Sequence, residues 1–300
     1  MPETRRSPAA APIAAARPAD WGGAGVDLDA YLARLGHTGG TAPTLDTLHA
    51  LHRAHAAAIP FENIDPALGH PVSLDIGDIQ DKLVRRPRGG YCYEHNLLLA
   101  AVLERLGYAV TGYVARVRMG SDQVRPTSHA LLGVDLDGRT WLADVGFGGE
   151  GLLEPLPRRD GAEVRQGGWS FRLDRMAAAD GTAMWVLRSL HPDGWFDLHS
   201  FTLDPQHPAD YAVRNHYTAT HPRSPFTGQL LCQRTGPEAR TTLRDLTLAT
   251  TTPDGATTER TLTPAELPGV LRDTFGIEPD GPDLAAITRL AARDAVATAR

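Results

Sequence analysis

The sequence predicts an α+β fold in which a helical region, a β-rich region and a mixed region follow one another. Apolar residues recur at helical spacing over residues 26–107, which favours a helical bundle. Over residues 108–205 apolar and polar residues alternate between turn signals, which is typical of a small barrel or curled sheet. Residues 206–300 combine short threonine-rich strands with helical stretches, so a mixed α/β region closed by a C-terminal helix is expected.

Three helices are expected in the first part of the bundle. The first runs from Leu28 to Leu35, where apolar residues share one face, and Gly36 offers a stop. Thr44 begins a second helical stretch that Pro60 ends, because the residue before a proline avoids helical geometry. A third helix is expected from Ile76 to Leu83.

The β-rich region is expected to contain hairpins. A strand is predicted from Ala109 to Met119, where valines alternate with other residues. The stretch SHALLGVDLDGRTWLADVGF predicts two strands joined at Asp137–Gly138, and WSFRLDRM and AMWVLRSL predict another pair. In the last region one helix is expected to be capped by Thr263, and a final helix to cover about Asp283 to Thr298.

Composition and charge exclude several kinds of partner. The 300-residue chain has a formal net charge of −6, which argues against general nucleic-acid binding but allows a local basic patch for a phosphorylated ligand. Hydrophobic residues make up 42% of the chain, yet no apolar run approaches the roughly 18 residues that span a bilayer. We therefore expect a cytoplasmic protein with no nucleic-acid and no membrane partner.

Residues 1–25 differ in composition from the rest of the chain. They are rich in alanine, proline and arginine, and they lack the continuous apolar segment of a secretory signal. A disordered extension is therefore expected, with an organellar transit peptide as the alternative.

No metal site is expected from the histidines and cysteines. The three-residue spacing of His49, His52 and His55 drifts around a helix, and no carboxylate or cysteine completes a ligand set. Cys92 and Cys232 are the only cysteines, and they are far apart and match no metal spacing. A disulfide between them is not expected in a long chain without a secretory signal.

Cys92 stands where a helix is predicted to begin. It lies in RGGYCYEHN, and the apolar run that follows predicts a fourth helix from Cys92 to Leu106, stopped by Gly107. Helix N-termini carry partial positive charge and unpaired N–H groups, which stabilise a thiolate. Gly89 and Gly90 allow a tight approach into that helix and leave the sulfur open to a substrate.

A cysteine nucleophile needs a histidine beside it and a carboxylate that orients the histidine. His129 and Asp144 lie on the two strands predicted to flank Asp137–Gly138, at similar heights, so they can be cross-strand neighbours. A Cys92–His129–Asp144 triad is therefore predicted. Spacing alone leaves open that the cysteine and the histidine are packing residues and that the aspartate only forms a turn.

The segments around these residues resemble the arylamine N-acetyltransferase family. RGGYCYEHN is similar to the family's cysteine motif, and SHALLGV and WLADVGFGG are similar to the segments that hold its histidine and aspartate. Further similar segments occur in the same order and extend the resemblance over roughly residues 28–277: YLARLG, PTLDTLHALHRAH, IPFEN, the stretch from FTLDPQHPADY to LLCQR, and DTFGI.

The resemblance implies a fold, an activity and a mechanism. The fold is a helical bundle, a β-barrel and an α/β lid, with a cysteine-protease-like Cys–His–Asp core between the first two. The activity is acetyl transfer from acetyl-CoA, as a co-substrate, to the nitrogen of an arylamine or arylhydrazine. Transfer is expected to be ping-pong, through an acetyl thioester on Cys92.

The resemblance and the local sequence also indicate residues around the triad. Glu62 and Arg88 occupy family positions that pair, so a salt bridge is expected, with two unrelated surface charges as the alternative. The loop VGFGG can offer backbone N–H groups to CoA phosphates or to an oxyanion. The remaining candidates are Phe61, Phe147 and Phe226 for the acyl and arylamine pocket, where plain core packing is the alternative, and Gly148 and Gly149 for CoA.

Three other functions remain open at this stage. Amide synthases that close ansamycin macrolactams also resemble this family, and they take a polyketide acyl chain from an acyl carrier protein. A thiol hydrolase or a transglutaminase-type enzyme would have the same order of triad residues. A binding module without catalytic activity is the third alternative.

Overall fold

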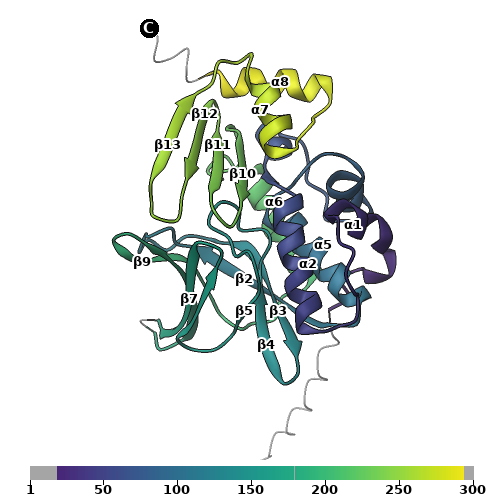
Figure 1. Cartoon of the computed structure of the whole chain (residues 1–300), viewed down its shortest axis with the longest axis vertical. Coiled ribbons are helices and arrows are strands. Elements are labelled where there is room, and N and C mark those ends of the chain that lie inside the picture. The colour runs from purple at the N-terminus through teal and green to yellow at the C-terminus, as the bar shows by residue number, and fades with distance from the viewer. Residues whose placement is uncertain (1–18, 179, 294–300) are drawn as a thin grey trace, which may run out of the picture.

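The computed structural model describes residues 19–178 and 180–293, and Figure 1 shows its three parts. Helices form one side of the molecule, an eight-stranded sheet lies beside them, and a second sheet with the C-terminal helices lies above. The α+β fold class predicted from the sequence is confirmed.

The helical region is built around one buried helix. Its elements are η1 (Gly23–Gly25), α1 (Leu28–Leu35), α2 (Leu45–Ala58), α3 (Ile64–Leu68), α4 (Ile76–Gln80), the π-helical turn η2 (Asp81–Arg85) and α5 (Cys92–Arg105). Thr44 caps α2, and Gly36 ends α1 with a left-handed φ of 64°. Every residue of α5 from Cys92 to Leu103 is buried, as expected of a helix that the rest of the bundle surrounds.

Packing begins earlier than the sequence predicted. Trp21 is only 4% exposed, and its indole N–H donates to the carbonyl of Val110 at 3.3 Å. The backbone N–H groups of Trp21 and Gly23 donate to the two carboxylate oxygens of Glu104 near the end of α5. A disordered extension is therefore wrong for residues 19–25, because one aromatic ring anchors a stretch whose average composition indicates disorder; residues 1–18 lie outside the described part.

The middle region forms a nearly closed, barrel-like antiparallel sheet in the order β5-β4-β3-β2-β9-β8-β7-β6. The strands are β2 (Ala109–Val117), β3 (Thr127–Leu136), β4 (Arg139–Ala143), β5 (Leu156–Pro157), β6 (Ala162–Gln166), β7 (Trp169–Ala177), β8 (Ala183–His191) and β9 (Gly194–Phe201). The predicted hairpin joins β3 and β4, and Asp137 and Gly138 both have the positive φ that such a turn requires.

The last region contains the lid sheet, in the order β1-β10-β11-β12-β13. The elements are β1 (Phe61–Glu62), α6 (Pro208–Thr220), β10 (Leu231–Thr235), β11 (Arg240–Arg244), β12 (Thr247–Thr251), β13 (Thr257–Thr261), α7 (Leu267–Val270), the π-helical turn η3 (Leu271–Phe275) and α8 (Gly281–Ala291). Because β1 pairs with β10, the segment IPFEN ties the helical region to the lid. A two-residue strand has no periodicity, so the sequence could not reveal this connection.

Two predicted boundaries in the lid differ from the structure. Thr263 does not cap a helix; its N–H donates to the Glu266 carboxylate in a turn, and α7 begins at Leu267. The final helix is capped by Asp280 and begins at Gly281, and its predicted end falls outside the described residues. Among the described residues no helix is long and apolar enough to cross a bilayer.

Candidate active site

Cys92 is the first residue of α5, as predicted, and is 3% exposed. Its Sγ faces the carbonyl of Ser128 at 3.7 Å. The backbone packs so closely around it that glycines are required: a Cβ on Gly89 would lie 1.9 Å from the Pro60 oxygen, and one on Gly146 would lie 2.8 Å from the Cys92 Cα. The helix start is therefore fixed from both sides.

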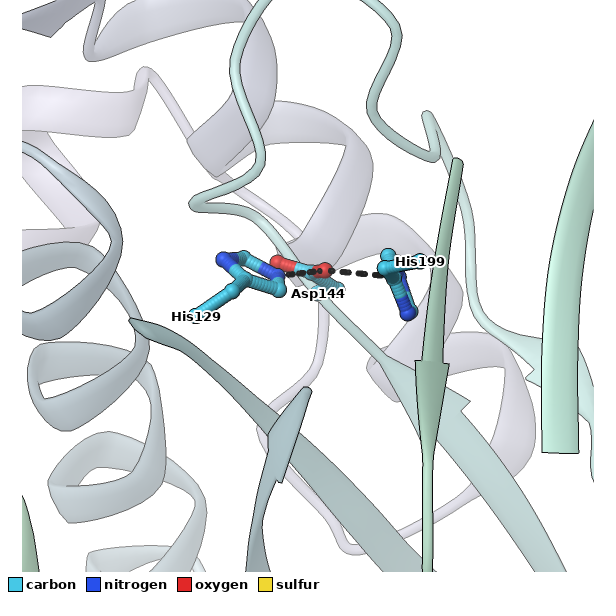
Figure 2. A group of neighbouring side chains, drawn as sticks. All are labelled: His129, Asp144 and His199. Atoms are coloured by element: carbon cyan, nitrogen blue, oxygen red, sulfur yellow. Dashed lines mark hydrogen bonds and ion pairs between the residues drawn. The ribbon is translucent and has the colours of Figure 1, made fainter. Parts of the chain in front are cut away.

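His129 and Asp144 meet as the sequence predicted. Nε2–H of His129 donates to Oδ2 of Asp144 at 2.6 Å, and both side chains are buried (Figure 2). The β3–β4 register pairs Leu132 with Ala143, so Asp144 follows the end of β4 and reaches His129 along the diagonal. Since Nε2 is bound to the carboxylate, Nδ1 is the ring nitrogen that remains available for the interaction of His129 with Cys92.

The site favours a charged imidazole. Burial alone would lower the pKa of His129, but the charge of Asp144, its hydrogen bond and the interaction with Cys92 raise that pKa to about 10. Burial would raise the pKa of Asp144, but His129, His199 and Asn96 lower it to about 2. The pair is thus stable as imidazolium and carboxylate across neutral pH.

Two side chains that were not among the predicted site residues hold Asp144, one through its carboxylate and one through its backbone. Asn96, one turn after Cys92, donates its amide to Oδ1 of Asp144 at 3.0 Å and to the carbonyl of Ala130 at 2.7 Å. Nε2 of His52 accepts the backbone N–H of Asp144 at 3.1 Å. The i, i+4 spacing of Cys92 and Asn96 was a signal for the first, because such residues share one helix face.

A cavity of about 1060 Å³ is lined by Cys92 and His129. The three predicted aromatic residues, Phe61, Phe147 and Phe226, also line it. Phe147 lies edge-on to His129 with ring centroids 5.0 Å apart, and the ring centroids of Phe61 and Phe226 are 5.8 Å apart. That these rings bind acyl or aryl groups stays a prediction.

The glycine loop lies at the edge of this cavity. Gly149 lines it, whereas Gly148 lines a small adjoining pocket. The carbonyls of both glycines accept hydrogen bonds from the hydroxyl of Thr235 in the lid, which fixes the loop. The contact of both residues with CoA stays a prediction.

The charges that line the cavity are mostly positive. One carboxylate, that of Glu150, stands among the cavity's arginines: Arg125, Arg223, Arg240 and Arg244. The chain as a whole has a formal net charge of −6, so this concentration of arginine is local. A basic lining of this kind attracts anionic ligands.

The expected pair of Glu62 and Arg88 is present, with Nε of the arginine 2.8 Å from Oε1 of the glutamate, and both are buried. It belongs to a larger group, the ion cluster, that also contains Asp65, Lys82 and Glu94. Lys82, the only lysine of the chain, contacts Oε1 of Glu94 at 2.8 Å and Oδ2 of Asp65 at 2.5 Å. The other oxygen of Glu94 accepts the N–H of Tyr91, the cap of α5, so the cluster holds the helix start that presents Cys92.

Two groups of described residues bring three potential metal-ligand atoms within 4.8 Å of one another. One consists of Asp65, His70 and Asp283, but Asp65 is engaged by Lys82 and Arg88. The other, His129, Asp144 and His199, already holds the triad hydrogen bond, which a bound metal would break. The expectation of no metal stays a prediction.

Comparison with known proteins identifies the family. Residues 44–283 match a family model described as N-acetyltransferase. The chain is 38% identical to a Mycobacterium tuberculosis arylamine N-acetyltransferase over 258 residues, covering 84% of this chain and 89% of that protein. The chain belongs to the arylamine N-acetyltransferase family. It is therefore an acyltransferase, and the family resemblance seen in its motifs is confirmed.

Solved arylamine N-acetyltransferases share its fold. A Nocardia farcinica arylamine N-acetyltransferase is 50% identical with a TM-score of 0.86, over 90% of this chain and 96% of that one. A Mycobacterium marinum arylamine N-acetyltransferase in complex with CoA is 36% identical with a TM-score of 0.80, over 89% of this chain and 98% of that one.

Proposed function

We propose that this protein transfers the acetyl group of acetyl-CoA to the nitrogen of an arylamine or arylhydrazine, through an acetyl thioester on Cys92. The observation that carries the proposal is the imidazole of His129, which is hydrogen-bonded to Asp144 on one side and interacts with Cys92 on the other. This is the arrangement of a histidine-activated nucleophile oriented by a carboxylate.

In the first half-reaction His129 holds the proton of Cys92, and the thiolate attacks the carbonyl carbon of the acetyl-CoA thioester. The bond between that carbon and the sulfur of CoA breaks, CoA leaves as a thiolate, and the imidazolium of His129 supplies its proton. One thioester replaces another, so this step is close to balanced in energy. Asp144 stabilises the imidazolium throughout.

In the second half-reaction the amine attacks the acetyl carbon. His129, now neutral, accepts the proton that the nitrogen loses, and the sulfur of Cys92 leaves as a thiolate. An amide has replaced a thioester, which drives the cycle forward. Because CoA leaves before the amine reacts, the kinetics are ping-pong.

The cavity suits both substrates. Its arginines match the phosphates of CoA, and the M. marinum relative has been solved with CoA bound. Its phenylalanines, next to the triad, offer apolar surface to an aromatic acceptor. One cavity can serve both because the substrates bind in turn.

Intact-mass analysis after mixing with acetyl-CoA tests the proposal. The wild type should gain one acetyl group, and an arylamine or arylhydrazine should remove it with formation of the amide. Cys232→Ala is a matched control, since that cysteine is fully buried in the lid core and should not affect acylation.

A Cys92→Ser protein that keeps full activity, or a wild type that forms product without an acetyl-enzyme, would contradict the proposed mechanism. Loss of the acetyl group to water at a comparable rate without amine would favour a hydrolase. No acylation by acetyl-CoA, but acylation by a polyketide thioester on a carrier protein, would indicate an amide synthase.

A further inference from the structure

His199 is a buried side chain next to the triad that the proposed mechanism does not use. It is fully buried on β9, and neither ring nitrogen has a hydrogen-bond partner among the described residues. Its Nε2 lies 3.8 Å from Oδ2 of Asp144, the same oxygen that His129 binds. Figure 2 shows the carboxylate of Asp144 between the two imidazole rings.

Strand order places His199 there. On β2, Ala115 pairs with His129 of β3 on one side and with Phe201 of β9 on the other, so these three side chains share one face of the sheet. His199 precedes Phe201 by two residues and lies on that face as well. The small side chain of Ala115 leaves room above β2, where the two imidazoles approach to 5.2 Å between centroids.

Packing alone does not account for a histidine at this position. An apolar ring would fill the same space among Phe147 and Phe201 without two unpartnered nitrogens, whose burial without a hydrogen bond is unfavourable. An ionised carboxylate only accepts hydrogen bonds, so a neutral imidazole beside it is favoured as the tautomer with Nε2–H toward the oxygen. At 3.8 Å this is a dipole contact, and an approach of less than 1 Å would make it a hydrogen bond.

Several titratable groups face His199 from the neighbouring elements. His129 from β3 is positively charged when it holds the triad proton, Cys92 lies beyond it on α5, and His52 of α2 contacts the backbone of Asp144. Burial and the charge of His129 lower the pKa of His199 to about 3, although Asp144 opposes them. His199 can therefore act as a fixed dipole at neutral pH.

We propose that His199 is a positioning residue of the triad, whose Nε2–H keeps the Asp144 carboxylate ionised and aligned with His129. This inference rests on the proposed function, because its effect is on acylation of Cys92. When His129 gives up its proton and binds the carboxylate less strongly, His199 holds the carboxylate in place for the next proton transfer. Donors to a carboxylate favour its charged form, so loss of this one should make Asp144 easier to protonate.

The test measures single-turnover CoA release from acetyl-CoA as a function of pH. His199→Phe keeps the ring shape but removes the donor, and it should slow acylation about 10- to 100-fold and move the acidic limb of the profile to higher pH. The KM for acetyl-CoA should change little. His199→Gln, which restores an N–H donor, should recover most of the rate, and Phe201→Leu, a change at a neighbouring ring that has no polar atom to offer Asp144, should stay within about twofold of wild type.

Equal rates and equal pH profiles for wild type and His199→Phe would overturn the inference, as would equal losses in the Phe and Gln variants without a pH shift. Nitrogen-15 NMR of the wild type provides a second test that needs no variant: a neutral Nε2–H tautomer is expected, and an Nδ1–H tautomer would overturn the inference. If the wild type itself forms no acetyl-enzyme, the proposed function fails, a result distinct from failure of the role of His199.

Discussion

Two buried polar clusters include residues from the N-terminal part of α5, and they are built differently. In the ion cluster both oxygens of Glu62 and both oxygens of Glu94 are occupied, by Arg88 and Lys82 and by backbone N–H groups. The second cluster, the triad cluster, consists of Cys92, His129 and Asp144 with Asn96 and His199, and in it the nitrogens of His199 have no hydrogen-bond partner among the described residues. The polar groups of the ion cluster are satisfied and fix the helix start, whereas the triad cluster contains an imidazole without a hydrogen bond beside the groups that exchange a proton.

The difference separates the two kinds of effect that a substitution can have. A buried ion pair is weak evidence for stability as such, yet removal of one partner leaves an uncompensated charge and is strongly destabilising. A change in the ion cluster should therefore lower the free energy of unfolding while the folded molecules react normally. A change in the triad should lower the rate while the fold survives.

The largest effect is expected for Asp144→Asn. The new amide can present its oxygen to the donors that Asp144 Oδ1 now accepts, Asn96 and the N–H of Gly146, and its NH₂ to His129. The imidazole would then carry its proton on Nδ1, toward the thiol, and could not accept the thiol proton. We expect acylation to fall about 10³- to 10⁴-fold, measured as single-turnover CoA release.

The fold should tolerate this change, since the hydrogen bonds are exchanged and not lost. Urea unfolding of Asp144→Asn provides the control. A loss of rate below about tenfold would contradict the assigned tautomer.

The next largest effect is expected on the free energy of unfolding, for the substitution Lys82→Met. This change leaves Glu94 and Asp65 without their shared cation, and breaking a buried pair costs about 3–5 kcal/mol in the free energy of unfolding. Arg85→Met is the matched control, because Arg85 is half-exposed and pairs with Asp81 at the surface, where a pair contributes about 0–1 kcal/mol. Both should be measured by urea unfolding.

Folded molecules of Lys82→Met should be acylated at a rate within a few-fold of wild type. In a burst experiment the amplitude reports the fraction of folded protein, and the rate constant reports acylation. An intact fold with a rate as low as that of Asp144→Asn would mean that the ion cluster takes part in the chemistry.

The same comparison shows what a sequence can reveal. Cys92, His129 and Asp144 could be predicted because a helix start and one hairpin turn, both local signals, place them. The aromatics and the pair of Glu62 and Arg88 came from the family resemblance.

His199 and Lys82 could not be found in this way. His199 reaches the site only because β9 pairs with β2, across a long stretch of intervening chain. Lys82 lies on a π-helical turn, where the side-chain period differs from that of an α-helix. The helix α6 did carry a local signal, Pro208 in its first turn with Asp210 bonded back to the N–H of His207, which apolar periodicity does not reveal.

A smaller effect is the pH dependence that His129 and Asp144 give to the free energy of unfolding. The pKa of His129 rises from 6.5 to about 10 on folding, so its contribution is complete below pH 6.5 and is lost as pH rises through 10. The pKa of Asp144 falls from 3.8 to about 2, so its contribution is present above pH 3.8 and is lost as pH falls through 2. Each group changes stability by no more than about 1.4 kcal/mol per pH unit.

The measurement compares Cys92→Ala with Cys92→Ala/His129→Gln, so that the thiol does not titrate. The difference in unfolding free energy should be constant from about pH 4 to 6.5 and shrink at higher pH, and it should vanish at a pH below 10 because the interaction with Cys92 that helps to raise the pKa of His129 is absent in both variants. A difference that grows with pH would mean that His129 is neutral in the folded state.

The smallest effect is expected for Gly146→Ala, which tests how tightly the triad cluster holds the helix start. The new Cβ would lie 2.8 Å from the Cα of Cys92 and 2.9 Å from its carbonyl oxygen, so one of the two backbones must move. Overpacking of this kind costs about 1–3 kcal/mol in stability. Gly40→Ala is the control, an exposed position where a Cβ would meet nothing within 4 Å and φ is not positive. Because the shift displaces Cys92 relative to His129, folded molecules of Gly146→Ala should be acylated more slowly than those of Gly40→Ala. Equal acylation rates for Gly146→Ala and Gly40→Ala would show that the site accommodates the displacement.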